Sequence, residues 1–173
     1  GFDIVSAGEL LRVIEAGGDP SKTVFSGVGK TEDEIRFALE KNIMCFNVES
    51  LEELLTINKI ALEHNAIANI SIRVNPSIDA KTHPYITTGL QDNKFGIDES
   101  EVVAAYKEAS TLKGLNIFGI DFHIGSQIMD IAPYKDSLLK IVKIIKDLKT
   151  LNINITHIDI GGGLGISYND EKA

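Results

Sequence analysis

The sequence of 173 residues contains a single cysteine, Cys45, no tryptophan and only 4 prolines. One cysteine excludes an internal disulfide and a cysteine-rich metal site, and no metal is expected. No apolar run has the length that spans a bilayer, and the first residues lack the basic and apolar regions of a signal peptide. The cytoplasm is therefore the expected location, without a membrane partner.

Basic residues are also fewer than acidic ones. The sequence has 17 lysines and arginines against 25 aspartates and glutamates, which gives a net charge of −8. Binding to nucleic acid needs a basic face, so this balance argues against that class of function. Low-complexity segments and linkers are lacking as well, and 43% of the residues are hydrophobic. The chain is therefore expected to form one globular domain or part of a larger one.

What the sequence has instead is a regular alternation of β-rich runs and amphipathic helical segments. Helices are expected between the strands, and Thr31 with Glu34 three residues later has the spacing of a capping box. Ser50 is expected to cap the next helix. A polar segment at 77–98 is longer than loops in compact domains normally are. The expected strands are 2–5, 23–26, 43–48, 70–74, 116–122 and 155–160.

Strands that alternate with helices predict a parallel sheet, either doubly wound or part of an eight-stranded α/β barrel. Polar residues gather where nearly every strand ends, whereas a doubly wound sheet concentrates its ligand site at one switch point. The sequence therefore favours the barrel. The residues at these ends are Asp3, Ser6, Ser26, Gly27, Asn47, Glu49, Arg73, Asn75, His123, Ser126, Gly161, Gly162 and Gly163.

The most informative strand end is the last one, where an apolar strand runs into Gly161, Gly162 and Gly163. Consecutive glycines cost conformational entropy, and a ligand that approaches the backbone is the usual compensation. Phosphate held by main-chain N–H groups is the commonest such ligand. With His123 and Ser126 on the neighbouring loop, the pattern predicts a phosphorylated cofactor across the ends of parallel strands.

Two nucleotide-binding patterns are incomplete. Residues 26–31 are similar to a P-loop, but Val24 stands where that pattern has its first glycine. Gly161 and Gly163 could begin a dinucleotide fingerprint, but Ile166 stands where its third glycine would be. A strand end followed by a capped helix start is the preferred interpretation of residues 26–31.

The 4 histidines show no metal-ligand spacing. His64 and His157 are expected to be structural. His83, in the polar segment, is either an idle surface residue or a contact for substrate or a partner chain. His123 differs because it ends a strand where other polar groups converge, so we expect it in the functional site.

Taken in order, several segments of the chain resemble the fold-type III decarboxylases that use pyridoxal 5′-phosphate. Residues 81–85 and 93–96 point to the diaminopimelate branch of this family rather than the ornithine or arginine branch. The similar segments together span essentially the whole chain and are 1–9, 25–31, 46–50, 73–76, 81–85, 88–89, 94–96, 123–127 and 159–165.

The resemblance implies a (β/α)8 TIM-type barrel with pyridoxal 5′-phosphate at the carboxyl ends of its strands. By similarity, His123 is a catalytic residue that stacks on the pyridine ring of the cofactor. Ser126 and Gly163 are implied to hold the phosphate, while Gly161 and Gly162 shape the turn.

Further residues match the polar ring that surrounds the cofactor in this family, namely Asp3, Glu9 and Arg73. The loop with His83 and Tyr85 resembles one near the active site and the subunit interface. The substrate is implied to be a small amino acid, and the reaction the decarboxylation of meso-2,6-diaminopimelate to L-lysine and carbon dioxide.

The resemblance also implies that the barrel is incomplete, with about strands two to seven forming a partial domain over residues 1–173. The lysine that bonds the cofactor is expected before Phe2, and a Glu-Pro-Gly-Arg segment after Ala173. A C-terminal β-domain that supplies a proton-donor cysteine across a homodimer is expected elsewhere. The parent protein is therefore expected to be the active homodimer, and this chain alone to be inactive.

Two alternatives stay open. One is a related decarboxylase that acts on another basic amino acid or on a carboxylated polyamine, and residues 77–94 are the feature that distinguishes it. The other is a non-catalytic relative built on the same barrel.

Overall fold

The computed structural model describes residues 1–76 and 95–167 of the chain. Its centre is a sheet in which every neighbouring pair of strands is parallel. A short strand, β5 (Ile97–Asp98), pairs with the end of β4. The other strands follow one another in chain order and are β1 (Phe2–Ile4), β2 (Thr23–Phe25), β3 (Cys45–Val48), β4 (Ala68–Asn75), β6 (Leu115–Asp121) and β7 (His157–Asp159).

This strand order decides between the two predicted architectures. A doubly wound sheet reverses its order at a switch point, whereas this sheet continues in one direction from β1 to β7. The amide of Asn47 on β3 also reaches the carboxylate of Asp159 on β7, although β4 and β6 lie between these strands. The sheet is therefore curled, and the fold is an incomplete α/β barrel, as the sequence predicted.

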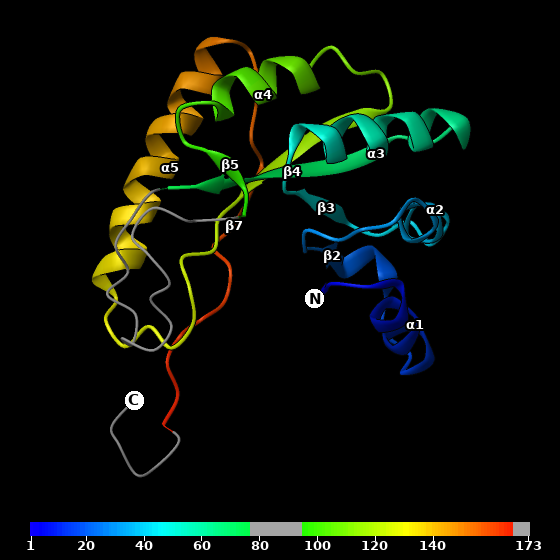
Figure 1. The fold of residues 1–173 in the computed structure, drawn as a ribbon, viewed down its shortest axis with the longest axis horizontal. Coiled ribbons are helices and arrows are strands. Elements are labelled where there is room, and N and C mark those ends of the chain that lie inside the picture. The colour runs from blue at the N-terminus through cyan, green and yellow to red at the C-terminus, as the bar shows by residue number, and fades with distance from the viewer. Residues whose placement is uncertain (77–94, 168–173) are drawn as a thin grey trace.

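Helices cover the outer side of the curled sheet (Figure 1). Three of them begin at predicted or evident caps: the Ser6 hydroxyl accepts from Glu9 N, the Ser50 hydroxyl from Glu53 N, and Thr31 forms the expected capping box with Glu34. A short 3-10 turn, η1 (Pro20–Lys22), precedes β2. The helices are α1 (Ala7–Glu15), α2 (Glu32–Glu40), α3 (Leu51–Glu63), α4 (Val102–Ala109) and α5 (Ala132–Thr150).

The hydrophobic core lies between the sheet and these helices. Phe25 on β2 and Phe46 on β3 are fully buried there, with their ring centroids 6.0 Å apart. Buried side chains of the helices pack on the same side, among them Leu10, Leu54 and Tyr106. Because side chains alternate along a strand, this packing leaves the other face of the sheet for the inside of the barrel.

A β-bulge decides which side chains of β6 face the inside. Ile70 pairs with Ile117, but the next residue, Ser71, pairs with Gly119, so Phe118 is an extra residue in the ladder. A Cβ atom on Gly119 would lie 2.3 Å from the Ser71 hydroxyl oxygen. It would also lie 2.9 Å from the backbone carbonyl oxygen of His157 on β7, so glycine is required at this position between the neighbouring strands.

Beyond the bulge, Asp121 pairs with Arg73 and shares its face of the sheet. The buried Tyr106 hydroxyl stabilises the irregular ladder, because it donates to the Gly119 carbonyl at 2.6 Å and accepts from Ile72 N at 3.3 Å. Backbone groups that would otherwise be buried without a partner are thus satisfied. The bulge and its tyrosine together direct Asp121 inward.

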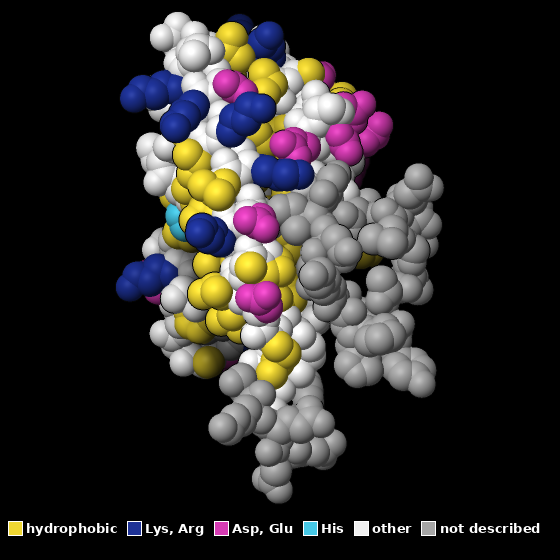
Figure 2. All heavy atoms as spheres, turned by 90° about the vertical axis from the view of Figure 1, so that its left-hand side faces the viewer, with side chains coloured by type: hydrophobic (Ala, Val, Ile, Leu, Met, Phe, Trp, Pro, Cys, Tyr) yellow, Lys and Arg dark blue, Asp and Glu magenta, His cyan; other side chains and the backbone are white. Residues whose placement is uncertain are grey.

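On the face that Figure 2 shows, over α5, basic side chains are interspersed with acidic and apolar ones. This face is thus not a uniformly basic surface. Within residues 1–76 and 95–167, no helix combines the length and the apolar character that crossing a membrane requires.

Candidate functional site

The inner face of the sheet is polar at the carboxyl ends of the strands. Asn47 on β3 and Asp121 on β6 are only 1% and 4% exposed. Arg73 on β4 and Asp159 on β7 flank Asp121 in the ladder. Barrels of this kind usually fill their interior with branched apolar side chains, and burying a polar group is costly unless it is paired. The polar interior therefore indicates a ligand site.

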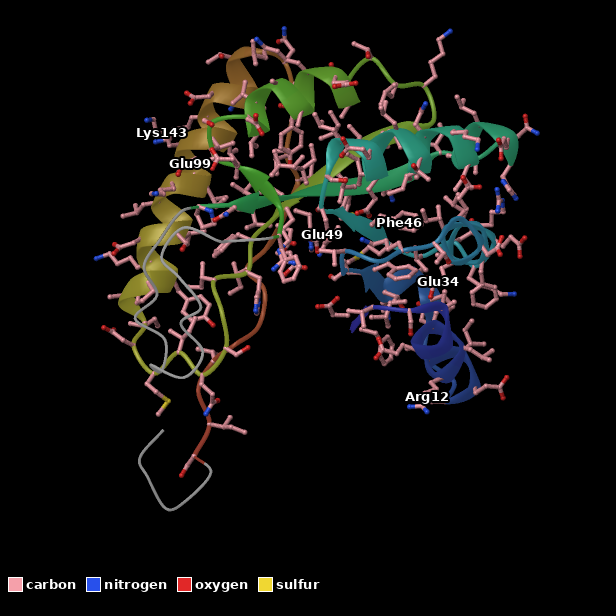
Figure 3. All side chains as sticks on the ribbon, in the orientation of Figure 1. Arg12, Glu34, Phe46, Glu49, Glu99 and Lys143 are labelled. Carbon is pink, nitrogen blue, oxygen red and sulfur yellow. The ribbon has the colours of Figure 1, made fainter. Side chains whose placement is uncertain are left out.

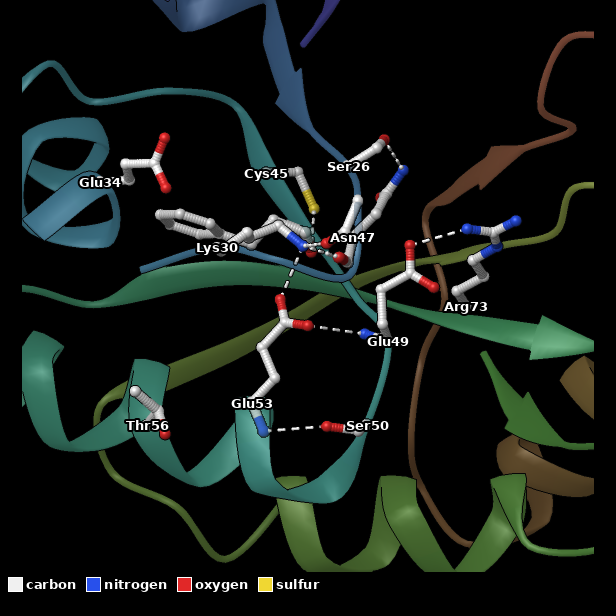
Figure 4. Close-up of polar contacts among 12 residues, drawn as sticks. Ser26, Lys30, Glu34, Cys45, Asn47, Glu49, Ser50, Glu53, Thr56 and Arg73 are labelled. Carbon is white, nitrogen blue, oxygen red and sulfur yellow. Dashed lines mark hydrogen bonds and ion pairs between the residues drawn. The ribbon is translucent and has the colours of Figure 1, made fainter. Parts of the chain in front are cut away.

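A chain of hydrogen bonds joins these strand ends. The Ser26 hydroxyl donates to Asp3 Oδ1 at 2.7 Å. Asn47 Nδ2 donates to Ser26 Oγ at 3.1 Å, as Figure 4 shows. The same Asn47 nitrogen donates to Asp159 Oδ2 at 3.1 Å. Asp159 in turn accepts from Gly161 N at 2.9 Å. The ends of β1, β2, β3 and β7 are thus connected across the inside of the barrel.

Arg73 and Glu49 form an ion pair beside this chain, with Arg73 Nη1 2.7 Å from Glu49 Oε1. The guanidinium also lies over the ring of Phe95, 5.8 Å from its centroid. Glu49 Oε2 is buried and has no hydrogen-bond partner among the described residues. In Figure 3 Glu49 lies centrally, where the strands come together, whereas Arg12 and Lys143 lie at the periphery.

Lys30, the lysine of the P-loop-like segment, is buried with a side chain that is 1% exposed. Its ammonium donates to Gly27 O, Asn47 O and Glu53 Oε1, each at 2.7 Å (Figure 4). Glu53 also accepts from Glu49 N, and burial raises the pKa of Glu53 against the opposing effect of Lys30. Because its ammonium group donates to three protein oxygens, Lys30 has a structural role in this segment. This agrees with the interpretation of residues 26–31 as a strand end followed by a capped helix start.

Two glycine-containing loops lie against each other at the ends of β6 and β7. Gly161 and Gly163 have φ values of 68° and 94°, in the left-handed region that favours glycine. A Cβ atom on Gly161 would lie 2.9 Å from His123 Nδ1. A Cβ atom on Gly163 would lie 1.8 Å from Gly125 O and 3.4 Å from Ser126 Cα. The predicted residues of both loops are therefore brought together.

Gly162 differs from its two neighbours. A Cβ atom there would meet no heavy atom of the described residues within 4 Å. The turn is fixed on either side of Gly162, because Gly161 N donates to Asp159 Oδ1 at 2.9 Å and Ile128 N donates to Gly163 O at 2.9 Å. The Gly162 carbonyl accepts from the Tyr134 hydroxyl at 2.7 Å, whereas the side-chain position of Gly162 is free of contacts with the described residues.

The pKa values of three titratable side chains at the site, Asp3, Asp121 and His123, are shifted in the direction that favours the uncharged form. Burial, together with the nearby Asp159 carboxylate, raises the pKa of Asp121 to about 8. Burial also raises the pKa of Asp3, in spite of the hydrogen bond from Ser26. Burial and the Arg73 cation lower the pKa of His123, which favours the neutral form of its imidazole. A neutral, flat ring at this place can stack on an aromatic ligand.

Two predicted residues do not contribute their side chains to the polar groups at the strand ends inside the barrel. Glu9 is at the start of α1, and its carboxylate accepts from Val5 N at 2.7 Å, so its visible contact is a local one. Ser126 is exposed on its loop and reaches the cluster through the backbone. His83 and Tyr85 lie outside the described residues.

Asp121 and Asp159 were not assigned a role from the sequence. One signal in the sequence could have indicated Asp121. It is an acidic residue in an apolar strand, two positions before His123, and residues at this spacing along a strand lie on the same face of the sheet. The bulge that turns Asp121 inward could not be read from that spacing. In the part of the chain that the structure describes, no group of three or more His, Cys, Asp or Glu residues could hold a metal ion.

The fold places the protein among the α/β barrels, whose ligands bind at the carboxyl ends of the strands. A family model described as "Pyridoxal-dependent decarboxylase, pyridoxal binding domain" matches residues 1–173. The chain belongs to this family, and pyridoxal phosphate is its cofactor.

Curated relatives agree with this assignment. The chain is 56% identical to diaminopimelate decarboxylase of Vibrio cholerae and 55% identical to that of Haemophilus influenzae, in each case over 99% of this chain. The aligned part is 41% of either relative, so the chain spans about two fifths of their length. The crystal structure of the Helicobacter pylori diaminopimelate decarboxylase complexed with L-lysine matches 98% of this chain and 43% of its own, with a TM-score of 0.92 and 48% identity.

Gly163→Ala is predicted to destabilise the fold, because the new methyl group would overlap the Gly125 carbonyl at a backbone φ of 94°. We expect a loss of more than about 1 kcal/mol in the free energy of unfolding, measured by urea titration. Gly162→Ala is the matched control, since its methyl group enters open space, and it should change stability by less than about 0.5 kcal/mol. Equal effects of the two substitutions would contradict the close packing of the loops.

Asp121 is predicted to make stability depend on pH. Because its pKa is raised to about 8 from 3.8, the folded protein holds this proton more tightly than the unfolded chain. Its contribution is therefore fully present below about pH 4 and is lost as the pH rises through 8. Urea titrations between pH 5 and pH 9 should show a steeper decline for the unchanged protein than for Asp121→Asn. Parallel curves would show that Asp121 titrates normally.

Proposed function

We propose that this chain is the cofactor-binding part of an enzyme that decarboxylates meso-2,6-diaminopimelate to L-lysine and carbon dioxide. The observation that carries the proposal is identity of 56% to a diaminopimelate decarboxylase over 99% of this chain. Lysine decarboxylase of Selenomonas ruminantium, by contrast, is 27% identical over 95% of the chain. The sequence thus lies nearer to the diaminopimelate branch over nearly all of its length.

The residues at the strand ends fit pyridoxal phosphate. The open space at Gly162, between two glycines with left-handed backbone, leaves room for a phosphate to approach the main chain. Ser126 lies on the loop packed against this turn and is exposed. In the proposal the phosphate is held by Ser126 and by the backbone N–H groups of Gly162 and Gly163, while Gly161, whose N–H donates to Asp159, shapes the turn.

His123 is proposed as the catalytic residue that supports the cofactor ring. It lies next to Gly161, and its lowered pKa favours the uncharged imidazole. When bound, pyridoxal phosphate supplies an aromatic system that accepts the electron pair left by loss of carboxylate. An uncharged imidazole gives that ring a flat apolar surface without adding a competing cation.

Asp3 and Arg73 are proposed to surround the cofactor with polar groups of opposite sign. Arg73 is held in place by Glu49, and Asp3 by the Ser26 hydroxyl, so neither side chain needs to reorganise when the cofactor binds. Lys30, whose side chain is buried, already donates to three oxygens. The lysine that bonds the cofactor is therefore proposed to lie outside the described residues.

A substrate panel tests the proposal. The full-length protein with pyridoxal phosphate should release carbon dioxide from meso-2,6-diaminopimelate, with kcat/KM at least about tenfold above that for L-ornithine, L-arginine, L-lysine and a carboxylated polyamine. Light scattering of the same sample should give the mass of the homodimer that we propose as the working form in the cytoplasm. Preference for another substrate would assign the protein to a related decarboxylase, and binding of the cofactor without turnover to a non-catalytic relative.

His123→Ala in the full-length protein is predicted to lower kcat/KM for that reaction by about 10²-fold, because the cofactor ring loses its support and is misplaced. His123→Phe keeps a flat face and should recover part of the cofactor affinity, measured by equilibrium dialysis. His64→Ala is the control, since His64 is exposed and contacts Ile60 O at the end of α3. A full effect in His123→Phe would assign the imidazole nitrogens, rather than stacking, as the important feature.

A further inference from the structure

The amide of Asn47 connects strand ends that the sheet itself does not join. Asn47 stands on β3, and its Nδ2 donates to Asp159 on β7 and to Ser26 after β2. The strands β4 and β6 separate β3 from β7 in the ladder. Backbone pairing therefore fixes β7 relative to β3 only indirectly, and the Asn47–Asp159 contact is a direct connection across the inside.

Asp159 passes this connection to the glycine turn. Its two carboxylate oxygens take one donor each, Oδ2 from Asn47 Nδ2 and Oδ1 from Gly161 N. Gly161 lies so close to His123 that a Cβ atom would be 2.9 Å from the ring nitrogen Nδ1. A rotation of the Asp159 carboxylate would therefore change the position of the turn relative to the imidazole.

We propose that Asn47 is a positioning residue for cofactor binding. Its amide orients Asp159, and Asp159 holds the Gly161 turn at the distance from His123 that the bound cofactor needs. This inference rests on the proposed function and deepens it, because Asn47 itself makes no contact with the phosphate or the ring in this scheme.

Donation, rather than volume, is what the site requires from Asn47. The side chain is 1% exposed, and Nδ2 has two acceptors for its two hydrogens. Its carbonyl oxygen Oδ1 is buried and has no hydrogen-bond partner among the described residues. The two hydrogen bonds that Nδ2 donates thus set the orientation of the amide, although this orientation leaves Oδ1 buried without a described donor.

An aspartate at position 47 would have the shape of asparagine but would donate only when protonated. The neighbouring carboxylates would raise its pKa, so protonation would begin within an accessible pH range. Protonated, its hydroxyl could donate to Asp159 and restore the connection. The charged and titratable groups around position 47 are Asp3, Lys30, Glu49, Arg73, Asp121, His123 and Asp159.

The test compares Asn47→Asp and Asn47→Leu with a matched pair at Asn69. Asn69 is at the opposite end of β4, where its Nδ2 donates to Met44 O and its Oδ1 accepts from Asn116. Asn69→Asp and Asn69→Leu therefore remove a half-buried, hydrogen-bonded strand amide without reaching the cofactor site. The full-length protein of each variant is titrated with pyridoxal phosphate at pH 8 and pH 6, and its thermal midpoint is measured at both values.

At pH 8 both Asn47 variants should bind pyridoxal phosphate roughly tenfold more weakly than the unchanged protein. At pH 6 the deficit of Asn47→Asp should shrink to about twofold while that of Asn47→Leu persists, because only aspartate gains a donor. The Asn69 variants should lower the thermal midpoint and leave the affinity unchanged at both pH values.

Affinity of Asn47→Asp equal to that of the unchanged protein at pH 8, or equal deficits of the Asn47 and Asn69 pairs, would overturn the positioning role alone. An equal, pH-independent deficit in both Asn47 variants would also overturn it, since it would show loss of packing. Failure of the unchanged full-length protein to bind pyridoxal phosphate would overturn the proposed function and this inference with it.

Discussion

Lys30 carries a positive charge into a region that water hardly reaches, and three oxygen acceptors at 2.7 Å surround its ammonium group. Removing one partner of such a buried pair costs about 3–5 kcal/mol, so the arrangement is strongly held. Two of the acceptors are the carbonyls of Gly27 and Asn47, at the ends of β2 and β3. The third, Glu53, also binds Glu49 N at the start of α3. The backbone that carries Asn47 and Glu49 is therefore fixed from the outer side of the sheet. The side chains of these two residues are left to make contacts inside the barrel, with Asp159 and Arg73.

The inside of the barrel then has to accommodate more carboxyl groups than cations, beside a cofactor whose phosphate is itself anionic. Each carboxyl group is treated differently: Glu49 is neutralised by Arg73, and Asp159 accepts from an amide and a backbone N–H. Asp3 accepts from Ser26, while burial and the Asp159 charge leave Asp121 largely protonated at pH 7. The repulsion that four ionised carboxylates would exert on a phosphate is reduced without a basic surface.

How much of this was predictable depends on whether the signal is local. The capping residues and the strands between them follow from patterns within a few positions, and Thr31, Glu34 and Ser50 take the predicted places. The strand β5 was missed inside the polar segment at 77–98, because its two residues are strand only through their pairing with β4. The inward direction of Asp121 depends on the bulge at Phe118, which arises from contact between β4 and β6. The partnership of Asn47 with Asp159 spans 112 positions of sequence and needs the curl of the sheet.

The glycine run shows the same distinction within three residues. As a sequence, the run suggested a ligand because glycines have no obvious use at the end of a strand. The chain's own packing accounts for two of them, since Gly161 lies against His123, Gly163 against Gly125, and both have left-handed backbone. Neither glycine is therefore evidence of a ligand by itself. Gly162 has ordinary backbone and open space above it, so no described contact requires glycine there. The argument for a phosphate at this turn rests on Gly162, together with a polar inner face that costs free energy to build.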